Sequence, residues 1–187
     1  MMPKTKQAFL IIALFFSFVN SKAQSSNALD AKLGYYNFTL GDSYKKWSSQ
    51  LQLFLDGNTQ KSYIYKNGEL PNLYGNDVKR VLLTFVDQKL TLITIELSAW
   101  DAPQEGRYSD LKKSLDKLTE LLNSYKILYG NPTENQTDIK TGKVAIYWEG
   151  KFKYLLLKLT YLGVTKGSRI TIDFGNKIIM SKSLNNY

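Results

Sequence analysis

Apolar residues repeat with two different periods along the chain, and the periods predict which segments form helices and which form strands. Near the start, four residues share the spacing of one helical face: Leu40, Tyr44, Trp47 and Leu51. They predict a helix over 42–52, whose first N–H groups Asp42 or Thr39 would cap.

Alternation of apolar and polar residues then predicts three strands. Residues 60–66 alternate and are rich in β-forming residue types, so they predict a strand, and the Gly- and Pro-containing segment 67–77 predicts a loop. Residues 78–86 and 89–97 are two apolar runs around the polar step Asp87-Gln88. This pattern predicts an antiparallel hairpin.

The strongest helical signal covers residues 108–129. Ser109 is a suitable N-cap, Gly130 a suitable left-handed residue after the end, and Pro132 prevents continuation. The apolar positions alternate in steps of four and three: Leu111, Leu115, Leu118, Leu122, Tyr125 and Tyr129. We expect this face to pack on a sheet; a coiled-coil dimer is the alternative for such a repeat.

The last third of the chain again has the pattern of strands. A polar loop is predicted over 131–142, followed by a hairpin of 143–148 with 151–161. Residues 169–174 alternate cleanly, and 177–180 could add a short edge strand. The order of one helix followed by three strands therefore occurs twice.

This order predicts an α+β fold of two tandem αβββ units. We expect one domain over 33–180, with halves at about 33–98 and 108–180, built on an antiparallel sheet. The helices would be packed on one face of that sheet, and the other face would be partly open to water.

Residues 1–23 have the three parts of a signal peptide. Lys4 and Lys6 precede the apolar run 8–19, and Ser21-Lys22-Ala23 offers small residues for cleavage. The run is too short to span a bilayer core of roughly 30 Å as a helix; an uncleaved anchor is the alternative. We therefore expect a periplasmic or secreted protein that does not span a membrane after cleavage, with a flexible leader at 24–32 and a loose tail at 181–187.

Composition restricts the chemistry available to the mature chain. Residues 24–187 keep 22 of the 25 basic and all 16 acidic residues, which leaves a net charge of +6. The lysines are scattered and the arginines are few, so we expect no nucleic-acid partner. The chain has no cysteine, which excludes disulfides and an N-terminal lipid anchor, and no histidine, which removes the usual general base and zinc ligand.

The sequence therefore predicts no catalytic, cofactor-binding or metal-binding residues. No serine-hydrolase, phosphate-loop or calcium-loop motif occurs, and Ser109 is better explained as a helix cap. Four acidic residues near strand ends are the remaining candidates for a carboxylate-based hydrolase: Asp87, Glu96, Glu149 and Asp173. Their positions are also typical of turns and of solvent-facing strand residues.

Tyrosine is the residue that most favours a binding role. All 13 tyrosines lie after residue 23. The tyrosine side chain combines an apolar ring with a polar hydroxyl, which suits a surface that binds a partner. The candidate partner-binding residues are Tyr63, Tyr65, Tyr147 and Tyr154. The alternative is that these rings cover the core or form cross-strand pairs.

Several motifs resemble those of uncharacterised exported small α+β proteins of Bacteroidota. They are Phe38-x-Leu40-Gly41-x-Ser43 before a short helix, Leu128-Tyr129-Gly130-Asn131-Pro132 at a helix end before a strand with Trp148, and a signal ending in Ala23-Gln24. The element order also resembles the outer-membrane assembly factor BamE and the β-lactamase inhibitor protein. BamE is a lipoprotein and the inhibitor family has disulfides, so this cysteine-free chain departs from both. The resemblance implies a fold, a compartment and a binding role.

We therefore expect an exported, non-catalytic binding protein of the bacterial cell envelope. Its partner would be an envelope or extracellular protein, or a glycan, bound on the open sheet face and the nearby loops 67–77 and 131–142; an inhibitor or immunity role fits. The alternatives are a carboxylate-based hydrolase of cell-wall or glycan substrates, and a carrier of small apolar ligands. The sequence predicts no oligomeric state.

Overall fold

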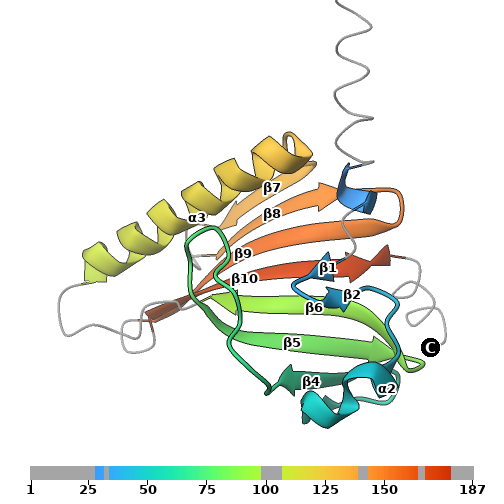
Figure 1. The fold of residues 1–187 in the computed structure, drawn as a ribbon. Helices are drawn as coiled ribbons and strands as arrows, with labels where there is room; N and C mark the ends of the chain where they lie inside the picture. The colour runs from blue at the N-terminus through green and yellow to red at the C-terminus, as the bar shows by residue number, and fades with distance from the viewer. Residues whose placement is uncertain (1–27, 32–33, 98–106, 139–142, 164–166, 178–187) are drawn as a thin grey trace, which may run out of the picture.

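The fold is dominated by one antiparallel sheet of eight strands in a computed structural model that describes residues 28–31, 34–97, 107–138, 143–163 and 167–177 (Figure 1). In spatial order the strands are β3 (Leu51–Asp56), β4 (Lys61–Tyr65), β5 (Val78–Val86), β6 (Lys89–Leu97), β10 (Gly167–Asn176), β9 (Lys153–Gly163), β8 (Lys143–Glu149) and β7 (Glu134–Asp138). The smaller elements are a two-stranded sheet of β1 (Gly34–Tyr35) and β2 (Phe38–Thr39), the helices α2 (Tyr44–Trp47) and α3 (Arg107–Tyr129), and the 3-10 turn η1 (Ser48–Gln50).

The large sheet consists of two four-stranded meanders. Strands β3 to β6 follow one another in space as in sequence, and so do β7 to β10 in the opposite direction. The two meanders join through the antiparallel pair β6–β10, where Ile95 lies opposite Ile172 and both are fully buried. One continuous core therefore runs across both halves of the chain.

The predicted fold class is wrong. The structure is mostly β, with eight strands in one sheet and two in another, and it is not an α+β arrangement of two αβββ units with helices packed on one face. Within the described residues, only α3 is a long helix; α2 has four residues and η1 three. Each half contributes four strands to the large sheet, where the sequence predicted three.

The missed strands are the two edges of the sheet. Strand β7 has the sequence ENQTD with every residue exposed, so it lacks the apolar alternation by which strands are recognised and resembled a loop. Strand β3 follows a predicted helix directly, and a bulge between Leu53 and Leu55 interrupts its alternation. The helix predicted over 42–52 therefore ends at Trp47, or at Gln50 with the 3-10 turn.

Other predicted elements are confirmed. The hairpin of β5 and β6 has the predicted bounds, and Asp87 and Gln88 form its turn with φ angles of 48° and 63°. The helix predicted over 108–129 is α3, which Gly130 follows with φ 76°. The hairpin of β8 with β9 and the last strand, β10, also form, each a few residues longer or shifted at its ends.

Helix α3 covers one face of the sheet, but the side of the helix that is buried is rotated slightly from the predicted one. Leu118, Tyr125 and Tyr129 are buried as expected, whereas Leu115 is 40% exposed and Leu121 is fully buried. Ser114 also faces inward, because its hydroxyl forms a hydrogen bond with the hydroxyl of Ser168 on β10. The polar pair fixes the rotation of the helix over the sheet.

The segment between β4 and β5 lies on the same face as α3 (Figure 1). The Tyr35 hydroxyl donates to the carbonyl of Pro71 at 2.7 Å. The ring of Tyr74 contacts that of Tyr125 on α3, with centroids 5.3 Å apart. This segment therefore covers the core and does not flank the opposite, open face as predicted.

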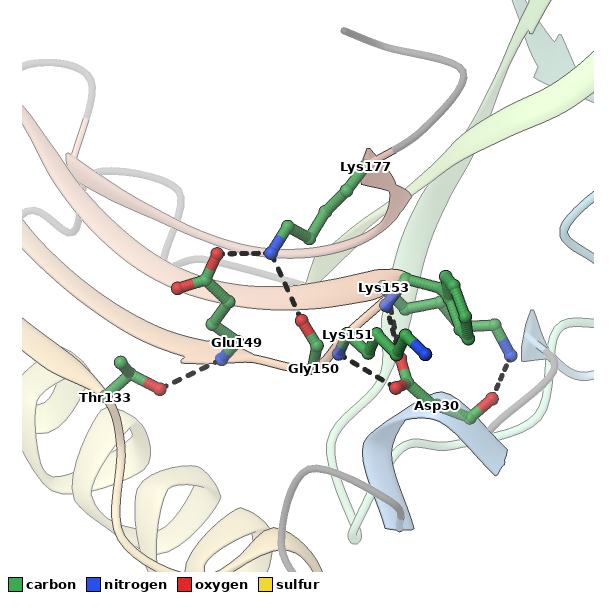
Figure 2. Close-up of polar contacts among 8 residues, drawn as sticks. Asp30, Thr133, Glu149, Gly150, Lys151, Lys153 and Lys177 are labelled. Carbon is green, nitrogen blue, oxygen red and sulfur yellow. Dashed lines mark hydrogen bonds and ion pairs between the residues drawn. The ribbon is translucent and has the colours of Figure 1, made fainter. Parts of the chain in front are cut away.

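A helical turn at residues 28–31 connects the N-terminal part to the β8–β9 hairpin (Figure 2). Leu29 is buried in the core, and the Asp30 carboxylate accepts the backbone N–H groups of Lys151, Phe152 and Lys153 at 2.8–3.0 Å. The sequence had placed residues 28–31 in a flexible leader. On the other side of the same turn, Lys177 pairs with Glu149.

Several predictions fall outside the described residues: the signal peptide at 1–23, most of the leader, residues 178–180 of the possible edge strand, and the tail at 181–187. Among the helices of the described part, none is long and apolar enough to cross a membrane.

Candidate functional site

The strand register defines an open face on the large sheet, opposite α3. Residues directly opposite one another on neighbouring strands project to the same side, so register and burial together assign the faces. One row across the open face is Ile64, Leu82, Thr94, Asp173, Leu156 and Tyr147. The adjacent row is Arg80, Glu96, Thr171, Lys158 and Ala145.

A buried carboxylate organises the centre of this face. Glu96 on β6 is only 6% exposed. One of its oxygens accepts a hydrogen bond from Nε of Arg80 on β5 at 3.1 Å. The other oxygen lies 3.4 Å from Nε of Arg169 on β10. Glu96 therefore positions two guanidinium groups above itself, one from each half of the chain.

A second buried carboxylate repeats this arrangement one row further on. Asp173 on β10 is 6% exposed, and one oxygen lies 2.6 Å from Nζ of Lys158 on β9. Its other oxygen is buried and has no hydrogen-bond partner among the described residues. Because Thr171 lies opposite Glu96 and Asp173 opposite Thr94, the two carboxylates are diagonal neighbours across the β6–β10 pair.

The cations are more exposed than the anions that hold them. The side chains of Arg169 and Lys158 are 46% and 38% exposed, while those of Glu96 and Asp173 are each 8% exposed. The open face therefore presents positive groups outward over buried negative ones. The arrangement can bind acidic groups, because guanidinium and ammonium groups form charge-assisted hydrogen bonds with carboxylates.

Two of the four predicted tyrosines lie together on this face. The rings of Tyr147 on β8 and Tyr154 on β9 have centroids 5.8 Å apart. The Tyr154 ring lies over Gly175 of β10, where an added Cβ atom would be 2.2 Å from the ring. Burial, and then the charge of Asp173, raises the pKa of Tyr154 to about 12, and burial also raises that of Tyr147. Both hydroxyls are therefore neutral near pH 7.

The other two tyrosines lie on the opposite face. Tyr63 pairs with Leu83, a fully buried residue of the covered face, and its ring contacts that of Phe85 at 5.8 Å. The Tyr65 ring contacts that of Phe38 at 4.9 Å. The structure therefore places Tyr63 and Tyr65 against the core and brings only Tyr147 and Tyr154 together.

The four candidate carboxylates also separate. Asp87 lies in the β5–β6 turn, and Glu149, 43% exposed in its side chain, pairs with Lys177. Glu96 and Asp173 are the pair that converges, and they are buried under cations where the pattern indicated solvent-facing positions. No group of three or more acidic side chains in the described part of the chain is placed to hold a metal ion.

Sequence reasoning missed the basic members of this site. Arg80, Arg169 and Lys158 lie on strands that were correctly predicted, and each occupies the alternate position to buried apolar residues. Two of the three arginines of residues 24–187 stand at such positions, which was the available signal. Their convergence depends on the β6–β10 pairing, which joins strands about 75 residues apart in the chain.

No model of a known protein family, no curated protein and no solved structure matches the chain.

Proposed function

We propose that this chain is an exported binding protein of the bacterial cell envelope that docks an acidic protein partner on the open face of its large sheet. The observation that supports this most is the pair of buried carboxylates that hold Arg80, Arg169 and Lys158 in place across four adjacent strands. Ordered cations lose less freedom on binding than flexible surface lysines do.

Arg169 is the residue best suited to meet the partner. Its side chain is 46% exposed and lies with Nε 3.4 Å from an oxygen of Glu96. An arginine held at Nε can still bind a carboxylate through its terminal N–H groups. The net charge of +6 on residues 24–187 further favours an anionic partner.

The tyrosine pair supplies the apolar part of the same surface. Tyr147 and Leu156 line a shallow pocket of about 250 Å³ next to β7, together with Glu134, Gln136 and Ala145. Aromatic rings beside ordered arginines are the side chains most often found at the energetic centre of protein interfaces. A partner that places acidic side chains over Arg169 and an apolar side chain near Tyr147 would use both.

The hydrolase alternative has less support. Glycoside hydrolysis needs two carboxylates that reach the substrate bond from either side. Glu96 and Asp173 are neighbours, but they lie beneath their cations and are nearly covered. We assign them to positioning Arg80, Arg169 and Lys158, so the binding function is the one we propose.

The test is capture from envelope extract followed by measurement with the purified partner. We expect a protein retained by the mature chain to bind Arg169→Gln and Tyr147→Ala at least roughly tenfold more weakly, as interface anchors do. Lys126→Gln, on the exposed side of α3, is the matched control and should bind normally. Affinity should also fall as salt is raised.

Three outcomes would contradict the proposal. They are variants that bind as well as the wild type, a captured protein with no acidic surface at the contact, and specific retention of a glycan with no protein. Hydrolysis of a cell-wall fragment that is lost in Glu96→Gln but kept in Lys126→Gln would favour the hydrolase instead.

A further inference from the structure

The outer edge of β3 has a composition that edge strands normally avoid. Leu53, Phe54 and Leu55 are consecutive, and their exposed fractions are 50%, 52% and 53%. An exposed apolar strand at the edge of a sheet is a template for pairing with another chain, so natural proteins place charges there. The other edge follows this rule, because β7 has the sequence ENQTD and no large apolar residue. The apolar edge at β3 therefore indicates an interaction surface.

The backbone of β3 is also open to pairing. β3 is the first strand of the large sheet, and among the described residues no strand pairs with its outer side. The carbonyl of Gln50 accepts the N–H of Lys66, which follows β4, at 2.9 Å. Because hydrogen-bonded and non-hydrogen-bonded pairs alternate along an antiparallel ladder, the backbone N–H and C=O groups of Leu51 and Leu53 point away from β4. They can form ladder hydrogen bonds with an added strand.

The bulge in β3 puts apolar side chains on both faces of this edge. Before the bulge, Leu53 lies opposite Tyr63, a residue of the covered face; after it, the register moves by one residue and Leu55 faces the open side. The ring of Phe54 is also on the open side, 5.4 Å from the guanidinium carbon of Arg80. A partner that rested on one face would leave apolar side chains of the other face in water. A strand added in the plane of the sheet covers both.

The strand is complementary to itself. Two β3 strands paired antiparallel about a twofold axis set apolar residues beside apolar residues. The only charged residue of β3, Asp56, is already paired with Lys61 at 2.9 Å, so the contact brings no unpaired like charges together. Pairing of β3 with the β7 edge of another copy would instead set Leu53, Phe54 and Leu55 against a polar strand with two acidic residues. The contact between β3 edges therefore closes as a dimer and does not extend into a fibre.

We propose that the protein forms a dimer by antiparallel pairing of β3 with β3 of a second copy, which joins the two large sheets into one. Each copy contributes a strand of six residues with three half-exposed apolar side chains. This contact is smaller than a standard protein interface, which buries about 800 Å² on each partner. The dimer is therefore weak and forms at high protein concentration.

The dimer would present two docking surfaces on one side, a consequence that rests on the function proposed above. A twofold axis that relates two antiparallel strands of one sheet stands perpendicular to the sheet, so the open faces of both copies point the same way. Two sets of Arg169, Lys158 and Tyr147 would then face one partner surface. A partner with two acidic sites can engage both sets and bind with greater avidity than either set alone provides.

Sedimentation equilibrium of residues 24–187, from about 10 µM to about 1 mM, tests for the dimer in the absence of any partner. We expect the mean mass to rise from that of one copy toward that of two. At a given protein concentration it should be higher at higher salt, because salt screens the repulsion between two copies of net charge +6. The docking proposal predicts the opposite effect of salt on partner binding.

Two lysine variants place a charge at the contact. Leu53→Lys and Leu55→Lys should each weaken the dimer at least roughly tenfold, since the twofold axis puts the new charge on both copies. Thr137→Lys adds the same charge to the exposed β7 edge and should leave the dimer unchanged. Circular dichroism shows whether each variant is folded; if one lysine variant of β3 is not, the other gives the result.

Distances between spin labels identify the edge that pairs. The chain has no cysteine, so Ser49→Cys and Thr137→Cys each provide one labelling site. Ser49 is exposed just before β3, and Thr137 is exposed on β7. In the dimer the two labels at residue 49 should be close enough to give a short distance by pulsed electron paramagnetic resonance. The labels at residue 137 should be much further apart, because they lie at opposite ends of the joined sheet.

The proposal is overturned if the chain stays monomeric at about 1 mM, if it associates beyond a dimer, or if folded lysine variants of β3 dimerise as the wild type does. A short distance between labels on β7 would overturn it as well. Arg169→Gln should dimerise normally, because β10 lies four strands from β3. A dimer that binds no acidic partner, or a monomer that does, would therefore separate this proposal from the docking proposal.

Discussion

Asp42 shows how one side chain fixes a short element that has little helical stability of its own. Its carboxylate accepts the N–H of Thr39 at 3.1 Å and the indole N–H of Trp47 at 3.0 Å, and it pairs with Lys46. The predicted cap at Asp42 or Thr39 is wrong, because Ser43 stands at the N-cap position of α2 and no side chain caps the helix. Asp42 instead connects β2 to α2 and to a core tryptophan. An α-helix of four residues depends on such contacts.

This role makes a prediction about stability and pH. Burial alone would raise the pKa of Asp42, but the hydrogen bonds from Lys46, Thr39 and Trp47 outweigh it and the pKa is lowered. Because the pKa of Asp42 is lower in the folded state than in the unfolded state, where it is about 3.9, the ionised carboxylate stabilises the fold at a pH above about 3.9. This stabilisation is lost as the pH falls through the pKa of the folded state. Asp42→Asn should therefore reduce the free energy of unfolding at pH 7 by about 1–2 kcal/mol.

Urea unfolding of wild type and Asp42→Asn from pH 7 to pH 2.5 measures this effect. The difference should be constant down to about pH 5 and should shrink below about pH 4, as the wild-type carboxylate becomes protonated. Asp56→Asn is the control, since Asp56 forms an exposed pair with Lys61 and its loss should cost less than about 0.5 kcal/mol. A difference that grows toward acid pH would contradict the assignment.

Between elements, the contact of residues 28–31 with the β8–β9 turn is the most specific one. Three consecutive backbone N–H groups converge on Asp30, and Gly150 leaves the space in which that carboxylate lies. An added Cβ atom at Gly150 would lie 2.5 Å from an oxygen of Asp30. The N-terminal segment and the hairpin therefore fit one another through this carboxylate (Figure 2).

The two residues should be energetically coupled. We expect Asp30→Ala to cost about 1–3 kcal/mol, because it leaves three N–H groups without their acceptor. Gly150→Ala should be destabilising in the wild type and clearly less so in the Asp30→Ala background, where the closest clash is gone. Chemical unfolding of the four proteins gives the coupling energy. Additive effects would show that Asp30 and Gly150 do not interact in solution.

The elements also show what the sequence could and could not predict. The β5–β6 hairpin and α3 have strong periodic patterns and turn residues, so their bounds were predicted to within a residue. The edge strands β3 and β7 were missed, because an edge strand with both faces exposed has no reason to alternate. A strand missed in each half is enough to change the fold class.

The candidate site depends on pairing between strands that are distant in sequence. Alternation placed Tyr147 and Tyr154 on strands, but only the register shows that they share a face with Arg169 and that Tyr63 does not. The β6–β10 pair, which brings Glu96 near Asp173, joins the two halves and leaves no local pattern. Contacts of this kind follow from the assembled sheet and not from any one segment.

At the scale of the whole molecule, the two four-stranded halves should unfold as one unit. The seam between them is continuous, with five residue pairs from Thr171–Glu96 to Gly175–Leu92. The buried apolar residues of both halves belong to one cluster. A shared core of this kind makes partial unfolding expose apolar surface on both sides, which favours a cooperative transition.

Each half contains a buried tryptophan that can report on it separately. The Trp47 indole donates to Asp42 in the first half, and the Trp148 indole donates to the carbonyl of Gly130 in the second. Two variants keep a single tryptophan each: Trp100→Phe with Trp148→Phe keeps Trp47, and Trp100→Phe with Trp47→Phe keeps Trp148. In each variant, the urea transition followed by tryptophan fluorescence should coincide with the transition followed by circular dichroism. Ile172→Ala, at the seam, should lower both midpoints together and cost about 2–5 kcal/mol. Two separated transitions, or a shift of the Trp148 signal alone, would show that the halves are independent domains joined only by strand pairing.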